Sequence, residues 1–246
     1  MEHHKIVLLG SGGCGKTTYL QRLSKGTFDR KYIATIGVEV QTIPFNTCDG
    51  YITYNIWDTA GQEKFSGLQE GYCVGSKAAI IMFDLTSNCS LKEIVYYIKN
   101  YIVGLNLKIP IAFCGTKSDE PNRKITNDYA IDFITKCFEL LKLSNEWNYF
   151  ETSSKSNQNL YEPFLYVTKK IQNDESIYFK ESNPIELKAE NDDIFKLFHN
   201  KQDEYNDYDY NYEDEEDEEE YEYQKYPEVQ SLIEGLKMFD LSKAIL

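Results

Sequence analysis

The stretch Gly10-Ser11-Gly12-Gly13-Cys14-Gly15-Lys16-Thr17 comes directly after the apolar run Ile6-Val7-Leu8-Leu9. It matches G-x-x-x-x-G-K-[ST], a pattern that lies between a strand and a helix. Its glycines let the chain wrap so that successive backbone N–H groups point at phosphate oxygens, at a helix N-terminus. The stretch predicts binding of a nucleoside triphosphate, with Lys16 on the outer phosphates and Thr17 on Mg²⁺. The expected contacts come from Gly12, Gly13, Cys14, Gly15, Lys16, Thr17 and Thr18.

Along residues 5–172, short strand patterns alternate with helical ones. Such alternation predicts an α/β sandwich of three layers, in which a mainly parallel sheet is covered by helices. The Asp49-Gly50 pair is a hairpin turn signal, so the second and third strands should pair antiparallel at the edge. We expect strands near 5–9, 38–46, 51–57, 78–84, 110–115 and 147–152, and helices near 16–24, 63–73, 90–104, 127–143 and 158–172.

The other polar motifs follow strands, and in such folds the ligand lies over the carboxyl ends of the strands. Asp58 ends a strand pattern and would hold Mg²⁺ through water, while Gly61 would present its backbone N–H to the terminal phosphate. In Gly115-Thr116-Lys117-Ser118-Asp119, the carboxylate is placed to accept both N–H groups on the edge of guanine, a pair that adenine does not offer. The loop Thr152-Ser153-Ser154-Lys155 would give a backbone N–H to the base carbonyl oxygen.

Taken singly, these residues have simpler interpretations. A strand-end aspartate such as Asp58 usually caps the following turn. Lys117 and Asp119 would, on their own, be an ordinary surface pair. It is the shared order and strand-end placement of the motifs that favours a nucleotide site.

Asp58-Thr59-Ala60-Gly61-Gln62, with the phosphate loop and the base-reading loops in this order, resembles the small Ras-like GTPases. The resemblance covers roughly residues 5–180 and is closest in pattern to the Ran family, the GTPases of nuclear transport. The stretches that resemble Ran are Lys31 to Val40, Asp58 to Phe65 with Gly67-Leu68, Ala79 to Asp84, and Lys155-Ser156-Asn157 with Pro163-Phe164-Leu165.

The resemblance implies a P-loop G domain over residues 1–178 that binds GTP and GDP with Mg²⁺. It implies that Thr35 coordinates Mg²⁺ and the terminal phosphate, that Phe28 stacks on the base, and that Gln62 positions the attacking water. Lys16 would stabilise the charge that develops on the phosphate oxygens. The implied metal set is Thr17, Thr35 and Asp58, and the implied base contacts are Thr116, Lys117, Asp119, Ser153, Ser154 and Lys155.

Hydrolysis of this kind should be slow without an activating protein, because no arginine except the surface candidate Arg30 is placed to act in cis. The loops around 30–40 and 61–75 would then have two states, being ordered when the terminal phosphate is present and released when it is lost. The implied partners are importin-β-type transport receptors, an exchange factor and a GTPase-activating protein. The resemblance also implies a monomer that moves between nucleus and cytoplasm.

Two alternatives remain open. The chain could be a GTPase with another trafficking or cytoskeletal role, or a nucleotide-locked scaffold that does not hydrolyse GTP. Thr116 stands where the family usually has asparagine, so the side-chain amide that bridges base and phosphate loop is lost. We therefore expect weaker nucleotide retention, with the guanine preference kept by Asp119.

The acidity of the chain is local. The formal net charge is −14, yet residues 203–223 contain thirteen Asp or Glu and no Lys or Arg, so without them the charge would be about −1. Tyrosines interleave with these acids and aliphatic residues are absent, which predicts a largely disordered segment over 203–225. It would serve solubility or dock a basic partner, and it would repel nucleic acid.

The segments on either side of the acidic run carry apolar patterns. A linker with a short helix is expected over 179–202. A short amphipathic helix is expected over 226–246, and it would fold back on the domain or bind a partner. Its apolar face would be Leu232, Ile233, Leu236, Phe239 and Leu241. The basic stretch that the family has after its fourth helix pattern is thin here, with only Lys136 and Lys142 nearby, which argues against a clasp between that region and the acidic tail.

The six cysteines form no C-x-x-C pair, and the three histidines do not accompany them. This pattern indicates neither a zinc site nor a disulfide scaffold, and it fits reduced thiols inside a cell. Cys14, in the phosphate loop, is expected to be exposed and open to modification. The apolar runs are too short to span a bilayer, and the last residues lack the cysteine of a prenylation signal. We expect a soluble protein without a lipid anchor.

Overall fold

The computed structural model describes residues 3–29, 33–35, 37–59 and 69–180. Within these residues, six strands form one sheet in the order β2-β3-β1-β4-β5-β6. The strands are β1 (His3–Gly10), β2 (Val38–Thr47), β3 (Gly50–Thr59), β4 (Ala78–Asp84), β5 (Ile111–Thr116) and β6 (Trp147–Glu151). The helices are α1 (Lys16–Lys25), α2 (Gln69–Cys73), α3 (Asn88–Tyr97), α4 (Asn127–Leu140) and α5 (Glu162–Gln172), with the π-helical segment η1 (Ile98–Val103) after α3.

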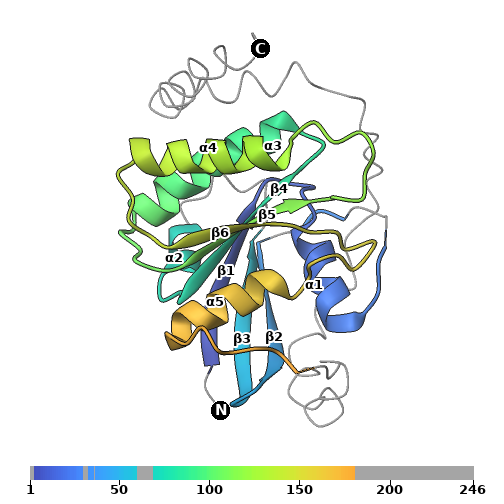
Figure 1. Cartoon of the computed structure of the whole chain (residues 1–246), viewed down its shortest axis with the longest axis vertical. Helices are drawn as coiled ribbons and strands as arrows, with labels where there is room; N and C mark the ends of the chain where they lie inside the picture. The colour runs from blue at the N-terminus through green and yellow to red at the C-terminus, as the bar shows by residue number, and fades with distance from the viewer. Residues whose placement is uncertain (1–2, 30–32, 36, 60–68, 181–246) are drawn as a thin grey trace.

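The strand pairing agrees with the sequence pattern. β2 and β3 pair antiparallel, and the other pairings of the sheet are parallel. The turn between β2 and β3 is held by Thr47, whose hydroxyl donates to Gly50 O at 2.7 Å and accepts from Asp49 N at 3.2 Å. Gly50 has φ +119, which a glycine adopts without strain. The predicted hairpin and the predicted α/β fold with one antiparallel edge strand are confirmed (Figure 1).

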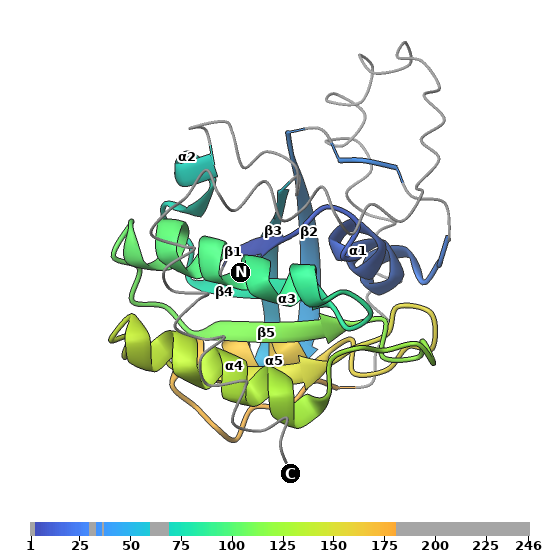
Figure 2. The ribbon, with the colours of Figure 1, turned by 90° about the horizontal axis from the view of Figure 1, so that it is seen from above.

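The sheet lies between two apolar layers, because successive side chains of a buried strand point to opposite faces. Val7 and Leu9 of β1 face the cluster formed with α3 and α4. Ile6 and Leu8 face the cluster formed with α1 and α5. Seen from above, α3 and α4 lie side by side over one face of the sheet (Figure 2). The loops that follow the carboxyl ends of the parallel strands therefore meet at one edge of the sheet, where α1 begins.

α4 ends at Leu140 rather than near 143, and residues 63–68 of the helix expected over 63–73 lie outside the described residues. Two other helices differ from the expected ranges for a visible structural reason. The pattern predicted one helix over 90–104, whereas α3 ends at Tyr97 and continues as the wider η1, in which Gly104 N donates to Lys99 O. The helix expected from 158 begins only at Glu162. The residues before it form a turn instead of a helix. Asn157 and Asn159 have φ +63 and +50, and Gln158 pairs with Ser153 through two backbone hydrogen bonds.

The chain beyond α5 returns to the β2–β3 hairpin. Phe179 forms an antiparallel bridge with Thr47, and its ring lies 4.9 Å from that of Phe45. Cys48 N donates to Tyr178 O at 3.0 Å, and Lys180 N donates to Asn46 O at 2.8 Å. The last described residues are therefore attached to the edge of the sheet.

Several predictions lie outside the described residues. They are the roles of Gly61, Gln62 and Arg30, the linker beyond Lys180, the acidic segment at 203–225 and the amphipathic helix at 226–246. In the part of the chain that the structure describes, no helix has both the length and the apolar character needed to cross a membrane.

Candidate functional site

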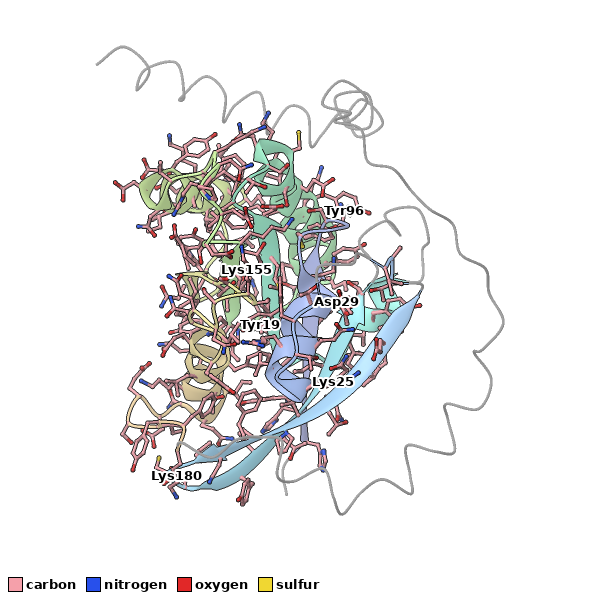
Figure 3. All side chains as sticks on the ribbon, turned by 90° about the vertical axis from the view of Figure 1, so that its right-hand side faces the viewer. Tyr19, Lys25, Asp29, Tyr96, Lys155 and Lys180 are labelled. Atoms are coloured by element: carbon pink, nitrogen blue, oxygen red, sulfur yellow. The ribbon has the colours of Figure 1, made fainter. Side chains whose placement is uncertain are left out.

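The predicted motifs gather at the carboxyl end of the parallel strands. The phosphate loop follows β1, Asp58 lies at the end of β3, Thr116 ends β5, and the loop from Thr152 follows β6. Lys155 lies in this region, well separated along the long axis of the molecule from Lys180 (Figure 3). The topology thus brings together residues that are more than a hundred positions apart in the sequence.

The phosphate loop fits closely against β4. Gly10 has φ +146, and a Cβ at this position would lie 2.2 Å from the backbone oxygen of Met82. The residue must therefore be glycine for the chain to pass. α1 begins at Lys16, after Gly15 with φ 99, and Gly12 and Gly13 are exposed. The first N–H groups of such a helix have no partner within the helix and form a natural anion site.

Lys16 is held inside this loop. It is only 6% exposed, and its ammonium donates to Gly10 O at 2.6 Å and Ser11 O at 2.8 Å. A lysine ammonium has three donors. The loop carbonyls therefore fix the charge in place and leave donor capacity for a phosphate oxygen.

Three oxygen-bearing side chains from separate elements meet beside the loop. Thr17 Oγ1 lies 2.7 Å from Thr35 Oγ1 and donates to Asp58 Oδ2 at 2.6 Å. Asp58 is fully buried, and among the described residues its Oδ1 has no hydrogen-bond partner. Burial raises the pKa of Asp58 to about 6, although the Thr17 hydrogen bond and the Lys16 charge act in the opposite direction.

This arrangement fits a small hard cation, because Mg²⁺ prefers oxygen ligands. A cation here would neutralise the buried carboxylate and give its second oxygen an interaction, directly or through water. Thr17, Thr35 and Asp58 are the residues that would hold it, which is the set named from the sequence.

The base-reading residues also lie together. Ser153 Oγ donates to Asp119 Oδ1 at 2.5 Å, and Lys155 Nζ lies 3.0 Å from Asp119 Oδ2. Partial burial acts to raise the pKa of Asp119, but the hydrogen bonds from Ser153 and Lys155 outweigh it and keep the pKa below its usual value. The carboxylate is therefore ionised near neutral pH and accepts hydrogen bonds. Ser154, in the loop after β6, is half-buried, as are Thr18 of α1 and Phe28 after α1.

Thr116 retains a contact that was expected to be lost. Its hydroxyl lies 2.6 Å from Cys14 O and 3.1 Å from Phe83 O, and its single hydrogen donates to one of them at a time. The link from β5 to the phosphate loop is therefore present. What a threonine lacks, compared with asparagine, is a second donor for the base.

The expectation that Cys14 is exposed is wrong. Its side chain is 1% exposed and packs in the apolar layer with α1 and α5, because the loop turns inward at this position. Burial raises the pKa of the Cys14 thiol, although Lys16 opposes this effect. The thiol is consequently neutral and shielded, which makes it a poor target for modification.

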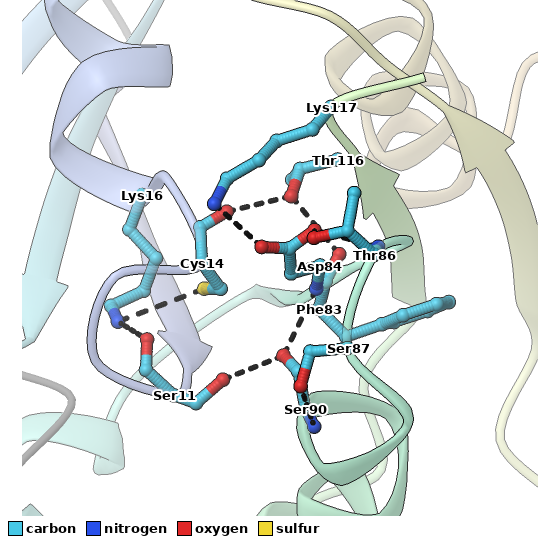
Figure 4. A network of polar contacts seen from close by, with 10 residues as sticks. All are labelled: Ser11, Cys14, Lys16, Phe83, Asp84, Thr86, Ser87, Ser90, Thr116 and Lys117. Atoms are coloured by element: carbon cyan, nitrogen blue, oxygen red, sulfur yellow. Dashed lines mark hydrogen bonds and ion pairs between the residues drawn. The ribbon is translucent and has the colours of Figure 1, made fainter. Parts of the chain in front are cut away.

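One polar residue of this region was missed. Asp84, at the end of β4, lies 2.5 Å from the ammonium of Lys117 (Figure 4). The sequence signal was the same as for the other motifs, a carboxylate directly after an apolar strand, but Asp84 served only as part of the resemblance. Its partner lies 33 positions further on, so only the fold shows the pair.

Comparison with known protein families adds an independent finding. Residues 5–173, more than half of the chain, match the Ras family. The match spans every strand from β1 to β6, apart from the first two residues of β1, and includes the phosphate loop, the three oxygen-bearing residues and both base-reading loops. The chain belongs to the Ras family of small GTPases.

Proposed function

We propose that this protein is a Ran-type switch that binds GTP and GDP with Mg²⁺, hydrolyses GTP slowly, and acts through partners that distinguish the two nucleotides. Membership in the Ras family supports GTP binding and hydrolysis in general. The observation that carries the switch is the contact between Thr35, in the segment before β2, and Thr17 at the start of α1. A loop residue at the metal position lets the terminal phosphate determine where the loop lies.

Each residue of the proposed site has a separate role in nucleotide binding or hydrolysis. Lys16 and the N–H groups at the start of α1 bind the phosphates, and Asp119 selects guanine. Bound Mg²⁺ would neutralise charge on the outer phosphates. Thr35 would hold the loop against the terminal phosphate, and Gln62 would orient the attacking water in line with it. Phosphoryl transfer needs this positioning and charge neutralisation more than covalent chemistry.

Exposed apolar side chains beside the site support a switch over a scaffold. Ile33 is 73% exposed and Val40 is 42% exposed, and they flank Thr35 in the sequence. Large apolar side chains left in water beside a functional site are typical of a surface that binds another protein. Ile33 belongs to the segment that carries Thr35, so its position would change with the nucleotide, whereas Val40 lies in β2.

Nuclear transport is the specific role we propose, on the strength of the stretches that resemble the Ran family. The partners would then be importin-β-type receptors, with an exchange factor and an activating protein that control the nucleotide. A basic partner that docks on the acidic segment would be separate from these. The protein would act in both nucleus and cytoplasm.

The experiment is a comparison of the two loaded forms. Protein carrying GDP or a non-hydrolysable GTP analogue, with its nucleotide checked by chromatography, is tested for binding to an importin-β receptor. Binding of the GTP form alone supports the proposal. If neither form binds while GTP is still hydrolysed, the protein is a GTPase with another role.

A scaffold would give a third pattern. It would show no GTP hydrolysis even with an activating protein, and Gln62→Leu would change nothing. Thr17→Ala is the matched variant, because it removes a metal-facing hydroxyl while leaving the base-reading loops intact. In a switch, it abolishes the difference between the GTP and GDP forms.

A further inference from the structure

Asp84 is a buried carboxylate whose two oxygens have different tasks. Oδ1 accepts from Thr86 N and Thr86 Oγ1, both at 2.8 Å, which closes a turn after β4. Oδ2 lies 2.5 Å from Lys117 Nζ. A turn that needs only Oδ1 is a common structural role for aspartate. The second oxygen is directed at a residue of the base-reading loop.

Lys117 is itself in an unusual conformation. Its φ is +58, in the left-handed region that non-glycine residues rarely adopt. Such a conformation persists when surrounding contacts hold it, and it is common at functional sites. The ion pair with Asp84 is one such contact, and the lysine stem passes beside Thr116 and Cys14 on the way (Figure 4).

The backbone of Asp84 leads to the phosphate loop. Asp84 N donates to Ser90 Oγ at 2.9 Å, and Ser90 Oγ lies 2.7 Å from Ser11 Oγ. Because Ser90 Oγ accepts from the backbone, its own hydrogen is available for Ser11. The first turn of α3 fixes Ser90, since Ser90 N donates to the N-cap hydroxyl of Ser87. A chain of polar contacts therefore runs from Lys117 to Ser11.

We propose that Asp84 is a positioning residue that, through Lys117 and Ser90, holds the base-reading loop and the phosphate loop at a fixed spacing and so slows nucleotide release. This inference rests on the proposed function, because it requires a guanine nucleotide bound across both loops. The link is independent of the Mg²⁺ residues and of the terminal phosphate. It is also separate from the direct contact between Thr116 and Cys14.

Asp84→Asn is the central variant, because asparagine keeps the turn through its amide oxygen while the charge is lost. Release of fluorescent GDP is measured for this variant, for Lys117→Met and for the double variant. Each single change should accelerate release about tenfold, the effect of losing a charge-assisted hydrogen bond. The double variant should be no more than about twofold faster than the faster single variant, since the two changes remove one interaction.

Two further readouts test whether this link is separate from the contacts to Mg²⁺ and to the terminal phosphate. The acceleration by Asp84→Asn should be equal for GDP and for a non-hydrolysable GTP analogue, and it should persist when EDTA removes Mg²⁺. Ser11→Ala and Ser90→Ala should each accelerate nucleotide release about threefold. The double variant should release nucleotide no faster than the faster single variant, because both changes remove the same hydrogen bond. The proposal is overturned if the accelerations caused by Asp84→Asn and Lys117→Met multiply in the double variant. It is also overturned if Asp84→Asn releases nucleotide within about twofold of the wild-type rate.

The matched control is a carboxylate of similar pairing far from the site. Glu175 follows α5, and its Oε1 lies 2.7 Å from Nζ of Lys170 in that helix. Glu175→Gln should leave the rate of nucleotide release unchanged. Wild-type protein that does not retain guanine over adenine nucleotides would refute the proposed function, and this inference with it. Wild-type protein that retains GDP, with Asp84→Asn unaltered, would refute the inference alone.

Discussion

The two ends of the sheet differ in whether their buried polar groups have hydrogen-bond partners. At the β2–β3 hairpin, the backbone groups of Cys48 and Asn46 pair with residues 178–180, and the ring of Phe179 packs 4.9 Å from that of Phe45. At the other end, the buried Oδ1 of Asp58 has no hydrogen-bond partner among the residues that the structure describes, and the ammonium of Lys16 is enclosed by loop carbonyls.

Buried polar groups are normally satisfied, so an exception needs a reason. At the hairpin end these backbone groups have partners and their contacts contribute to stability, although the buried Thr53 Oγ1 of β3 has no hydrogen-bond partner among the described residues. The nucleotide end carries an uncompensated buried charge, which costs stability until a cation arrives. Substitutions at the two ends should therefore separate into effects on folding and effects on binding.

The largest effect is expected at Lys16. Lys16→Met removes a buried charge that faces the phosphates and leaves Gly10 O and Ser11 O without this donor. Removing one partner of a buried charge pair costs about 4 kcal/mol, so affinity for GDP should fall roughly 1,000-fold. Equilibrium titration with fluorescent GDP measures it. Lys25→Met, at the exposed end of α1, is the control and should bind normally.

The second effect is a pH dependence at Asp58. Burial raises the pKa of Asp58 well above the usual value of an aspartate, to about 6, so ionisation opposes folding. The stability from this group is present in full below the unfolded pKa and is lost as pH rises through 6, by about 2 kcal/mol between pH 4.5 and 7.5. Urea unfolding of Mg²⁺- and nucleotide-free protein at pH 4.5 and 7.5 tests this.

Asp58→Asn is the variant that assigns the pH effect to this side chain. It should be more stable than wild type at pH 7.5 and should lose this part of the pH dependence. If wild type and variant change in parallel with pH, the carboxylate does not carry the uncompensated charge, and the contrast between the two ends is weakened.

The fold was more predictable than the details of the site. β2, β3 and the turn between them follow from alternating side chains and from Asp49-Gly50, signals that lie within a few residues of each other. The apolar spacing after residue 90 does not distinguish an α-helix from η1, because both place Ile98 and Ile102 in the core. Local patterns reveal an element, but not how tightly it is wound.

In the site, too, local motifs identified residues but did not reveal contacts that depend on the fold. The structure brings together Thr17 and Asp58, which belong to recognisable motifs, and Thr35, which the family resemblance implies, and their role at Mg²⁺ stays a prediction. The burial of Cys14 was missed, since the pattern of the phosphate loop does not say which side chain turns toward the core. Asp84 was missed because its role depends on a contact with a distant residue, Lys117.

At the hairpin end, Phe179→Ala should lower the free energy of unfolding by about 2 kcal/mol, because a half-buried ring is removed from contact with Phe45. The rate of GDP release should not change. Chemical denaturation and release kinetics on the same samples test both statements. Tyr178→Ala is the matched control, since Tyr178 is 57% exposed and should matter little. Faster GDP release in Phe179→Ala would mean that the two ends are coupled.

The smallest effect is expected at Thr116, which joins β5 to the phosphate loop. Thr116→Val keeps the shape of the side chain and removes the hydrogen bond to Cys14 O. A neutral hydrogen bond contributes about 1 kcal/mol, so GDP should leave roughly fivefold faster. ATP should still compete poorly, because Asp119 and its partners Ser153 and Lys155 are untouched. Equal competition by ATP in wild type or in Thr116→Val would show that Asp119 does not select guanine, and the nucleotide end would then bind phosphates without reading the base.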